Sequence, residues 1–207
     1  MTTDRPTEYL ISLVYELRKL PKETEWVEFK LNDAEPEDIG EYVSALANSA
    51  ALCGKASAYL IWGIEDGSHD LVGTTFLPSR IKVGNEELEN WLLRLLTPKI
   101  HFCFYEFGID GVRIVLLEIG RAFRHPVQFR GQEFIRVGSY KKRLKEFAEK
   151  ERALWRIFDQ TPFEKLIAAG ELSTEDLLKL FGLLRLFRSA KTPASRSTRW
   201  HPTIFVC

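Results

Sequence analysis

Basic side chains gather in one stretch of this chain, and they are its clearest chemical feature. Between Gly120 and Lys145 the sequence holds eight arginine or lysine residues and His125, with Glu133 as the single acid. Cations can hold phosphate oxygens, and an aromatic ring among them can stack on an unpaired base. Although the net charge of the whole chain is zero, this distribution predicts a strip that binds nucleic acid.

The residues expected to contact nucleic acid share a positive charge or a hydroxyl group. They are Lys30, Arg124, Arg130, Arg136, Ser139, Lys141, Lys142 and Arg143. Gly138 is expected to let the backbone approach its partner closely, and Tyr140 is placed to stack on a base. The alternative is an ordinary solvated charged face at the start of a helix, and the residues alone leave both interpretations open.

Carboxylates at the edges of predicted strands form a second candidate site. Glu23, Glu28 and Asp66 are its main members. Converging carboxylates can hold Mg²⁺ or Mn²⁺, which would activate water or stabilise a leaving oxygen in phosphodiester cleavage. Glu23 and Glu28 differ by an odd number, so they would point to opposite faces of one continuous strand. They can converge only if Glu23 lies in a loop.

The spacing of these carboxylates by itself favours structural roles over catalysis. In that interpretation Glu23 and Glu25 face solvent and Asp66 forms a turn. Glu28 would then pair with Lys30 or Arg136, and no metal or other cofactor would be needed.

Several common chemistries have no motif in this sequence. Cys53-Gly-Lys-Ala56 lacks the upstream glycine and the hydroxyl of a phosphate-binding loop, and no Gly-x-Gly-x-x-Gly follows a strand, so an ATPase is not expected. The three cysteines and four histidines are scattered, without a zinc-binding pattern. No apolar run is long enough to cross a membrane, and the N-terminus lacks the apolar core of a secretory signal. We therefore expect a soluble cytoplasmic protein with free thiols.

Hydrophobic periodicity predicts the elements that position these residues. Helical spacing covers 8–20, 36–51 and 85–97, with Asn85 as a cap. Segment 25–30 alternates as a strand, 57–64 is a buried strand, and 71–73 is a short return strand. Two hairpins are expected, with turns at 109–111 and 130–132. A helix is then predicted over 143–158, with further helices over 162–187 and an irregular basic tail after that.

Three segments, taken together, resemble the Schlafen AlbA-like domain, which is described as a DNA-binding or divergent AAA domain. Segment 23–30, Glu-Thr-Glu-Trp-Val-Glu-Phe-Lys, resembles its opening Glu-Ser-x-x-x-Glu-Phe-Lys. Ala47-Asn-Ser49, with Gly63-Ile-Glu-Asp66 and Val72-Gly73, is similar to its second block. Segment 134–139, Phe-Ile-Arg-Val-Gly-Ser, is similar to its closing Tyr-Ile-Arg-Val-Gly-Ser. The blocks occur in family order, but the glycine pair usual after Asn-Ser is Ala50-Ala51 here.

The resemblance implies an α/β (α+β) module with a compact mixed sheet and flanking helices over residues 1–158. A helical extension at 159–187 and a basic tail at 188–207 would follow. The resemblance also implies that the protein binds DNA or RNA and has a regulatory role. Some Schlafen members are metal-dependent ribonucleases that cleave structured RNA, and their carboxylate triad would fall on Glu23, Glu28 and Asp66. A third hypothesis is homodimerisation or partner docking through the apolar helices of 162–187.

Overall fold

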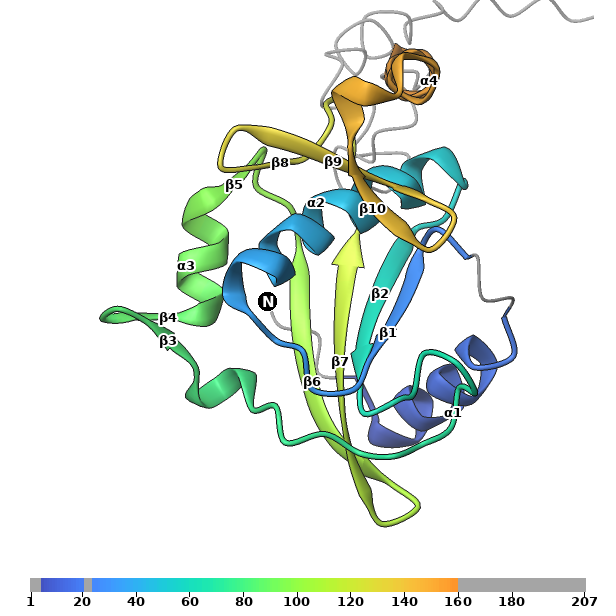
Figure 1. The fold of residues 1–207 in the computed structure, drawn as a ribbon, viewed down its shortest axis with the longest axis vertical. Helices are drawn as coiled ribbons and strands as arrows, with labels where there is room; N and C mark the ends of the chain where they lie inside the picture. Colours follow the sequence, from blue (N-terminus) through green and yellow to red (C-terminus); the bar gives the residue numbers. More distant parts are fainter. Residues whose placement is uncertain (1–4, 21–23, 160–207) are drawn as a thin grey trace, which may run out of the picture. The chain divides into compact units, whose positions relative to one another are not determined.

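The central sheet has four strands in the order β1–β2–β7–β6 (Figure 1). These strands are β1 (Val27–Lys30), β2 (Ser57–Trp62), β6 (Phe102–Ile109) and β7 (Val112–Gly120). The structure, a computed structural model, describes residues 5–20 and 24–159. β1 and β2 are parallel because helix α2 (Pro36–Leu52) connects them, whereas the other neighbours are antiparallel. The fold is therefore the mixed α/β class that the sequence predicts.

Each face of the central sheet is covered by a helix. Helix α1 (Thr7–Leu17) packs Val14 and Leu17 on a cluster that includes Val27 and Phe29 of β1. Helix α2 packs on the opposite face, over a cluster that includes Leu60 and residues of β7. Since strand residues alternate between faces, Glu28 and Lys30 lie on the face that α2 covers. Strand alternation thus carries two charged side chains toward a buried helix.

A second sheet lies on the far side of α2, which contacts strands of both sheets (Figure 1). Its strand order is β10–β9–β8–β5. The strands are β5 (Leu96–Thr97), β8 (Gln128–Phe129), β9 (Gln132–Val137) and β10 (Tyr140–Arg143), and a small hairpin of β3 (Lys82–Val83) and β4 (Glu86–Glu87) lies apart from them. Helix α4 (Ala148–Asp159) buries Leu154 and Phe158 in the cluster that contains Ile135 of β9. Most predicted basic residues therefore belong to this smaller sheet.

Both predicted hairpins are present, and their turns explain why. Ile109 pairs with Val112, so Asp110 and Gly111 form a two-residue loop with φ values of 51° and 83°. The turn at Arg130 and Gly131 has φ values of 50° and 73°. Positive φ at both central positions suits the right-handed twist of a hairpin, and Asp-Gly is a preferred pair for it.

Three predicted elements differ from the structure. Asn85 caps no helix: it lies in the turn between β3 and β4, and helix α3 (Leu88–Leu95) begins after them. The return strand at 71–73 is only one bridge, between Ile64 and Leu71. The helix predicted from Arg143 begins only at Ala148, because strand β10 and the short 3₁₀ turn η2 (Leu144–Glu146) precede it. A second short 3₁₀ turn, η1 (Pro78–Arg80), lies before β3. Pairing with β9 overrides the local helical pattern in β10.

Several predictions concern residues outside the described part of the chain. These are the position of Glu23, the helices at 162–187 with their proposed homodimer, and the basic tail. Among the residues that the structure describes, no helix is long and apolar enough to span a bilayer.

Candidate nucleic-acid interface

The β9–β10 hairpin, which carries the predicted basic segment, is attached to α2 by buried polar side chains. Ser44 Oγ accepts a hydrogen bond from the Phe134 N–H at 3.0 Å, and Ser49 Oγ accepts one from the Arg136 N–H at 3.0 Å. Both serines are fully buried. The two serines thus bind backbone N–H groups on the edge of β9 that faces away from β10. On that edge, side chains of α2 provide the hydrogen bonds that a neighbouring strand would otherwise provide.

Asn48 completes this attachment with three hydrogen bonds. Its amide Nδ2 donates to the carbonyl oxygens of Val127 at 3.0 Å and Phe134 at 2.9 Å, and its Oδ1 accepts from the Val127 N–H at 2.7 Å. The side chain is fully buried. Asn48 therefore joins α2 both to the hairpin and to the chain entering β8, which gives the Asn-Ser pair noted in the sequence a structural role.

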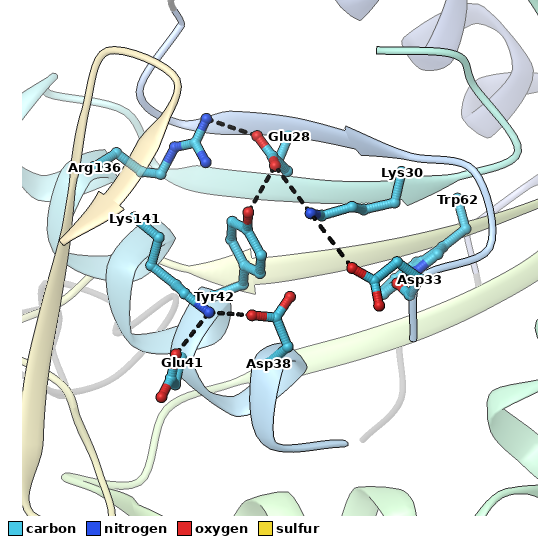
Figure 2. Close-up of polar contacts among 9 residues, drawn as sticks. All are labelled: Glu28, Lys30, Asp33, Asp38, Glu41, Tyr42, Trp62, Arg136 and Lys141. Atoms are coloured by element: carbon cyan, nitrogen blue, oxygen red, sulfur yellow. Dashed lines mark hydrogen bonds and ion pairs between the residues drawn. The ribbon is translucent and has the colours of Figure 1, made fainter. Parts of the chain in front are cut away.

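A buried ionic cluster lies where β1, α2 and β9 meet, and Glu28 is at its centre (Figure 2). Glu28 Oε2 lies 2.6 Å from Arg136 Nη2, and its Oε1 accepts a hydrogen bond from the Tyr42 hydroxyl at 2.8 Å. Lys30 Nζ lies 3.5 Å from the same Oε1. Glu28 therefore pairs with both Lys30 and Arg136, so both partners anticipated for it from the sequence are present.

Tyr42 is the aromatic centre of this cluster. The cationic groups of Lys30, Lys141 and Arg136 lie 4.7, 4.5 and 5.6 Å from its ring centroid. Burial, reinforced by the neighbouring Glu28 carboxylate, raises the pKa of Tyr42 above its ordinary value. The phenol therefore stays protonated and keeps its hydrogen bond to Glu28.

Arg136 does not reach the surface in this structure. It is 1% exposed, and its Nε and Nη1 atoms have no hydrogen-bond partner among the described residues. The Glu28 carboxylate compensates its charge. Arg136 therefore fixes the hairpin to β1, and a direct contact with phosphate would require this pair to open.

Two further predicted contacts are engaged by acids of α2. The Lys141 ammonium pairs with Asp38 and with Glu41, the latter at 2.6 Å, and the lysine side chain is 14% exposed (Figure 2). Arg130 Nη2 lies 2.5 Å from Glu37 Oε1 at the surface. The acids that the sequence places around Pro36 thus neutralise part of the basic stretch, and sequence spacing gave no signal for this pairing.

The remaining predicted residues of the hairpin face solvent. Ser139, Lys142 and Arg143 are exposed, and neither cation has an acidic partner among the described residues. Tyr140 is 68% exposed, and Lys142 Nζ lies 5.7 Å from its ring centroid. Arg124, also exposed, lies before β8, with its guanidinium 5.7 Å from the ring of Phe123.

Glu25 is a site residue for which the sequence suggested only solvent exposure. Its Oε1 accepts a hydrogen bond from the Gly138 N–H at 3.1 Å, and both of its oxygens bond Lys150 of α4, at 2.8 and 2.9 Å. Gly138 lies in the β9–β10 turn with φ of 58°, a conformation that favours glycine. The chain before β1 therefore holds the hairpin turn, and the opening and closing sequence blocks meet there.

The described residues do not assemble a metal site. Asp66 is exposed in the turn after β2, Glu28 is shared by two cations, and Glu23 lies outside the described residues. No group of three or more His, Cys, Asp or Glu side chains within 5–20 and 24–159 could hold a metal ion. As arranged, Glu28 does not fit a divalent cation, because Arg136 and Lys30 occupy its oxygens. The metal site stays a prediction.

Helix α2 thus lies between two sheets, and the hairpin is held by the Asn48-Ser49 pair and by the buried Glu28–Arg136 contact. The sequence matches the Schlafen, AlbA_2 family over residues 23–145. The chain therefore belongs to the Schlafen AlbA_2 family, and this membership suggests a nucleic-acid-binding role.

Other comparisons add little to this assignment. No curated protein matches the chain. One solved structure that it resembles is the DIP2311 protein from Corynebacterium diphtheriae, at 19% sequence identity and a TM-score of 0.44. The match covers 72% of this chain and 29% of that one, so the chain spans less than a third of the length of that protein.

Proposed function

We propose that this chain binds nucleic acid through the exposed side of the β9–β10 hairpin, at Ser139, Tyr140, Lys142 and Arg143. These four residues are called the hairpin face below. The hydroxyl and the two cations suit phosphate oxygens, and the tyrosine ring suits stacking on an unpaired base.

The observation that carries this proposal is the exposure of Tyr140 beside Lys142. The Tyr140 side chain is 68% exposed on an edge strand, so most of its ring is available to a partner, and a tyrosine offers both an apolar ring and a polar hydroxyl group. Lys142 and Arg143 have no acidic partner among the residues described, whereas Lys141 pairs with two acids of α2. A single-stranded nucleic acid suits both the tyrosine ring and the cations, because it offers unstacked bases and phosphates.

The basic strip is smaller than the sequence suggested, and its parts have different tasks. Lys141 and Arg136 attach the hairpin to α2 and β1. Arg130 pairs with Glu37, while Lys30 contacts Glu28. We propose that these four position the hairpin face or surround it and that Arg124 extends it. We propose a regulatory role for the chain, in which it binds nucleic acid and does not cleave it.

Two adjacent lysines of β10 provide a matched test. The affinity of purified protein for labelled single-stranded RNA, single-stranded DNA and duplexes is measured by fluorescence anisotropy across a salt series. We expect Lys142→Ala to weaken binding and to reduce the slope of log affinity against log salt by about 1, because one phosphate contact is lost. Lys141→Ala, whose ammonium faces two α2 acids, should keep the wild-type slope.

The outcome that would overturn the proposal is equally specific. If Lys142→Ala and Tyr140→Ala both bind every probe as the wild type does, the hairpin face is not the interface. Circular dichroism of each variant checks that the fold is retained. The comparison of single-stranded with duplex probes, and of RNA with DNA, identifies the preferred nucleic acid.

A further inference from the structure

Two hollows meet at Pro98, at the end of the second sheet opposite to β10. The larger has a volume of about 440 Å³, with Lys99, His101, Arg121 and Phe123 in its lining. The smaller has a volume of 260 Å³, with His125, Gln128, Glu133 and Trp155 in its lining. Pro98 lines both, so the hollows adjoin.

The larger hollow is basic. Arg121 and His101 are exposed, and none of the described residues that line this hollow is acidic. Lys99 is partly engaged, because its ammonium donates to the carbonyl oxygens of Arg94 in α3 at 3.2 Å and of Leu96 in β5 at 3.1 Å. A concave site with an arginine, an imidazole and no acid suits an anion, and arginine is the side chain best matched to phosphate geometry.

The smaller hollow has an aromatic wall and polar groups. Trp155 of α4 is 39% exposed, and the His125 ring lies edge-on to it with centroids 5.8 Å apart. Thr97 pairs with Gln128, and Gln128 pairs with Glu133, so these three side chains lie in a row on one face of the sheet. Gln128 Nε2 donates to Glu133 Oε1 at 2.9 Å, which leaves Oε2 of the carboxylate to accept from a ligand.

We propose that the paired hollows bind one nucleotide of a nucleic-acid strand, with its phosphate at Arg121 and His101 and its base against Trp155. An indole face suits the flat base, and Gln128 and Glu133 offer hydrogen bonds to the base edge. The proposal rests on the proposed function, since it adds a second contact to the same ligand class. A strand that reached from the hairpin face to this site would cross the second sheet.

Tryptophan fluorescence tests the site directly, with adenosine and cytidine 5′-monophosphates as probes and inorganic phosphate as competitor. We expect the nucleotides to quench the wild-type emission and Trp155→Phe to remove that quenching. Arg121→Ala should raise the half-saturating concentration about tenfold, because a charge-assisted contact to phosphate is lost. Arg113→Ala is the matched control: Arg113 is an exposed arginine near the start of β7, whereas Arg121 follows its end. It should titrate as the wild type does.

A labelled oligonucleotide separates this proposal from the proposed function. We expect Arg121→Ala and Lys142→Ala each to weaken oligonucleotide binding. If Arg121→Ala binds normally and the nucleotides do not quench Trp155, the paired hollows are not a site, while an effect of Lys142→Ala still supports the hairpin face. If Arg121→Ala weakens binding while Lys142→Ala and Tyr140→Ala both bind as the wild type does, the hairpin face is overturned and the paired hollows stand. Quenching by free nucleotides that no oligonucleotide displaces would instead identify a free nucleotide as the ligand and overturn binding of a strand.

Discussion

The carboxylate of Glu28 and the guanidinium of Arg136 form a buried ion pair, with Oε2 and Nη2 2.6 Å apart, between strand β1 and the basic hairpin. The two residues are 108 positions apart in the chain, and they belong to the first and last of the sequence blocks that mark the family. Because Tyr42 of α2 bonds the same carboxylate, one contact joins three elements. The position of the hairpin face depends on this contact.

Glu28→Gln should lower the free energy of unfolding by about 3–5 kcal/mol, because it leaves the Arg136 charge buried without its counterion. Urea denaturation measures this loss. Glu37→Gln, which breaks the exposed pair with Arg130, should cost at most about 1 kcal/mol. Adding Arg136→Met to Glu28→Gln should restore part of the stability, since apolar groups can replace a buried ion pair. Equal losses for Glu28→Gln and Glu37→Gln would show that burial of the pair has no energetic weight.

Asn48→Ala should lower the free energy of unfolding by about 3 kcal/mol, because it leaves the Val127 N–H and the Phe134 carbonyl without this buried partner. Urea denaturation gives the loss, and hydrogen exchange at the Val127 amide should accelerate. Asn90→Ala, at an exposed position of α3, is the control and should change stability by less than about 0.5 kcal/mol. A Val127 amide that stays protected in Asn48→Ala would contradict the assigned role.

The raised pKa of Tyr42 predicts that the free energy of unfolding falls at high pH. Its pKa is raised in the folded protein by burial and by the Glu28 carboxylate, so the unfolded chain loses the phenol proton first. The stabilising contribution is complete below the ordinary tyrosine pKa near 10 and falls as pH rises above it, by about 1.4 kcal/mol per pH unit. The stability difference between the wild type and Tyr42→Phe should therefore shrink above pH 10. Curves that remain parallel to pH 11 would contradict this, and Tyr140→Phe serves as the exposed control.

The ribonuclease alternative and the binding proposal differ in whether the protein cleaves RNA in the presence of Mn²⁺. With two cations on Glu28, we expect Mn²⁺ to leave labelled tRNA intact and the melting temperature unchanged. Cleavage that requires Mn²⁺ and disappears in Asp66→Asn would establish the nuclease instead. Asp66 is exposed in a turn, so this substitution should leave the fold intact, and Asp70→Asn, exposed nearby, serves as the control.

Local sequence patterns determined most of the elements of this protein. Alternation in β1, the apolar run of β2 and helical spacing in α1 and α2 indicate those elements correctly, because each pattern reflects burial of one face or of both. The Asp110-Gly111 turn likewise specifies its hairpin through backbone conformation alone. Strand β10 was missed because Lys141, Lys142 and Arg143 have no strand-like pattern of their own and form a strand only by pairing with β9.

Only the tertiary structure decided which charges are available to a ligand. The sequence correctly located the basic stretch, yet it could not show that Lys141 faces Asp38 and Glu41 while Lys142, its neighbour, faces solvent. Charge pairing between distant segments depends on how α2 packs against the hairpin. Local sequence patterns do not indicate which side chains of two distant segments will lie close together. The residue types determine which chemical groups the surface can offer. The packing of α2 between two sheets determines which of these side chains remain exposed to a ligand.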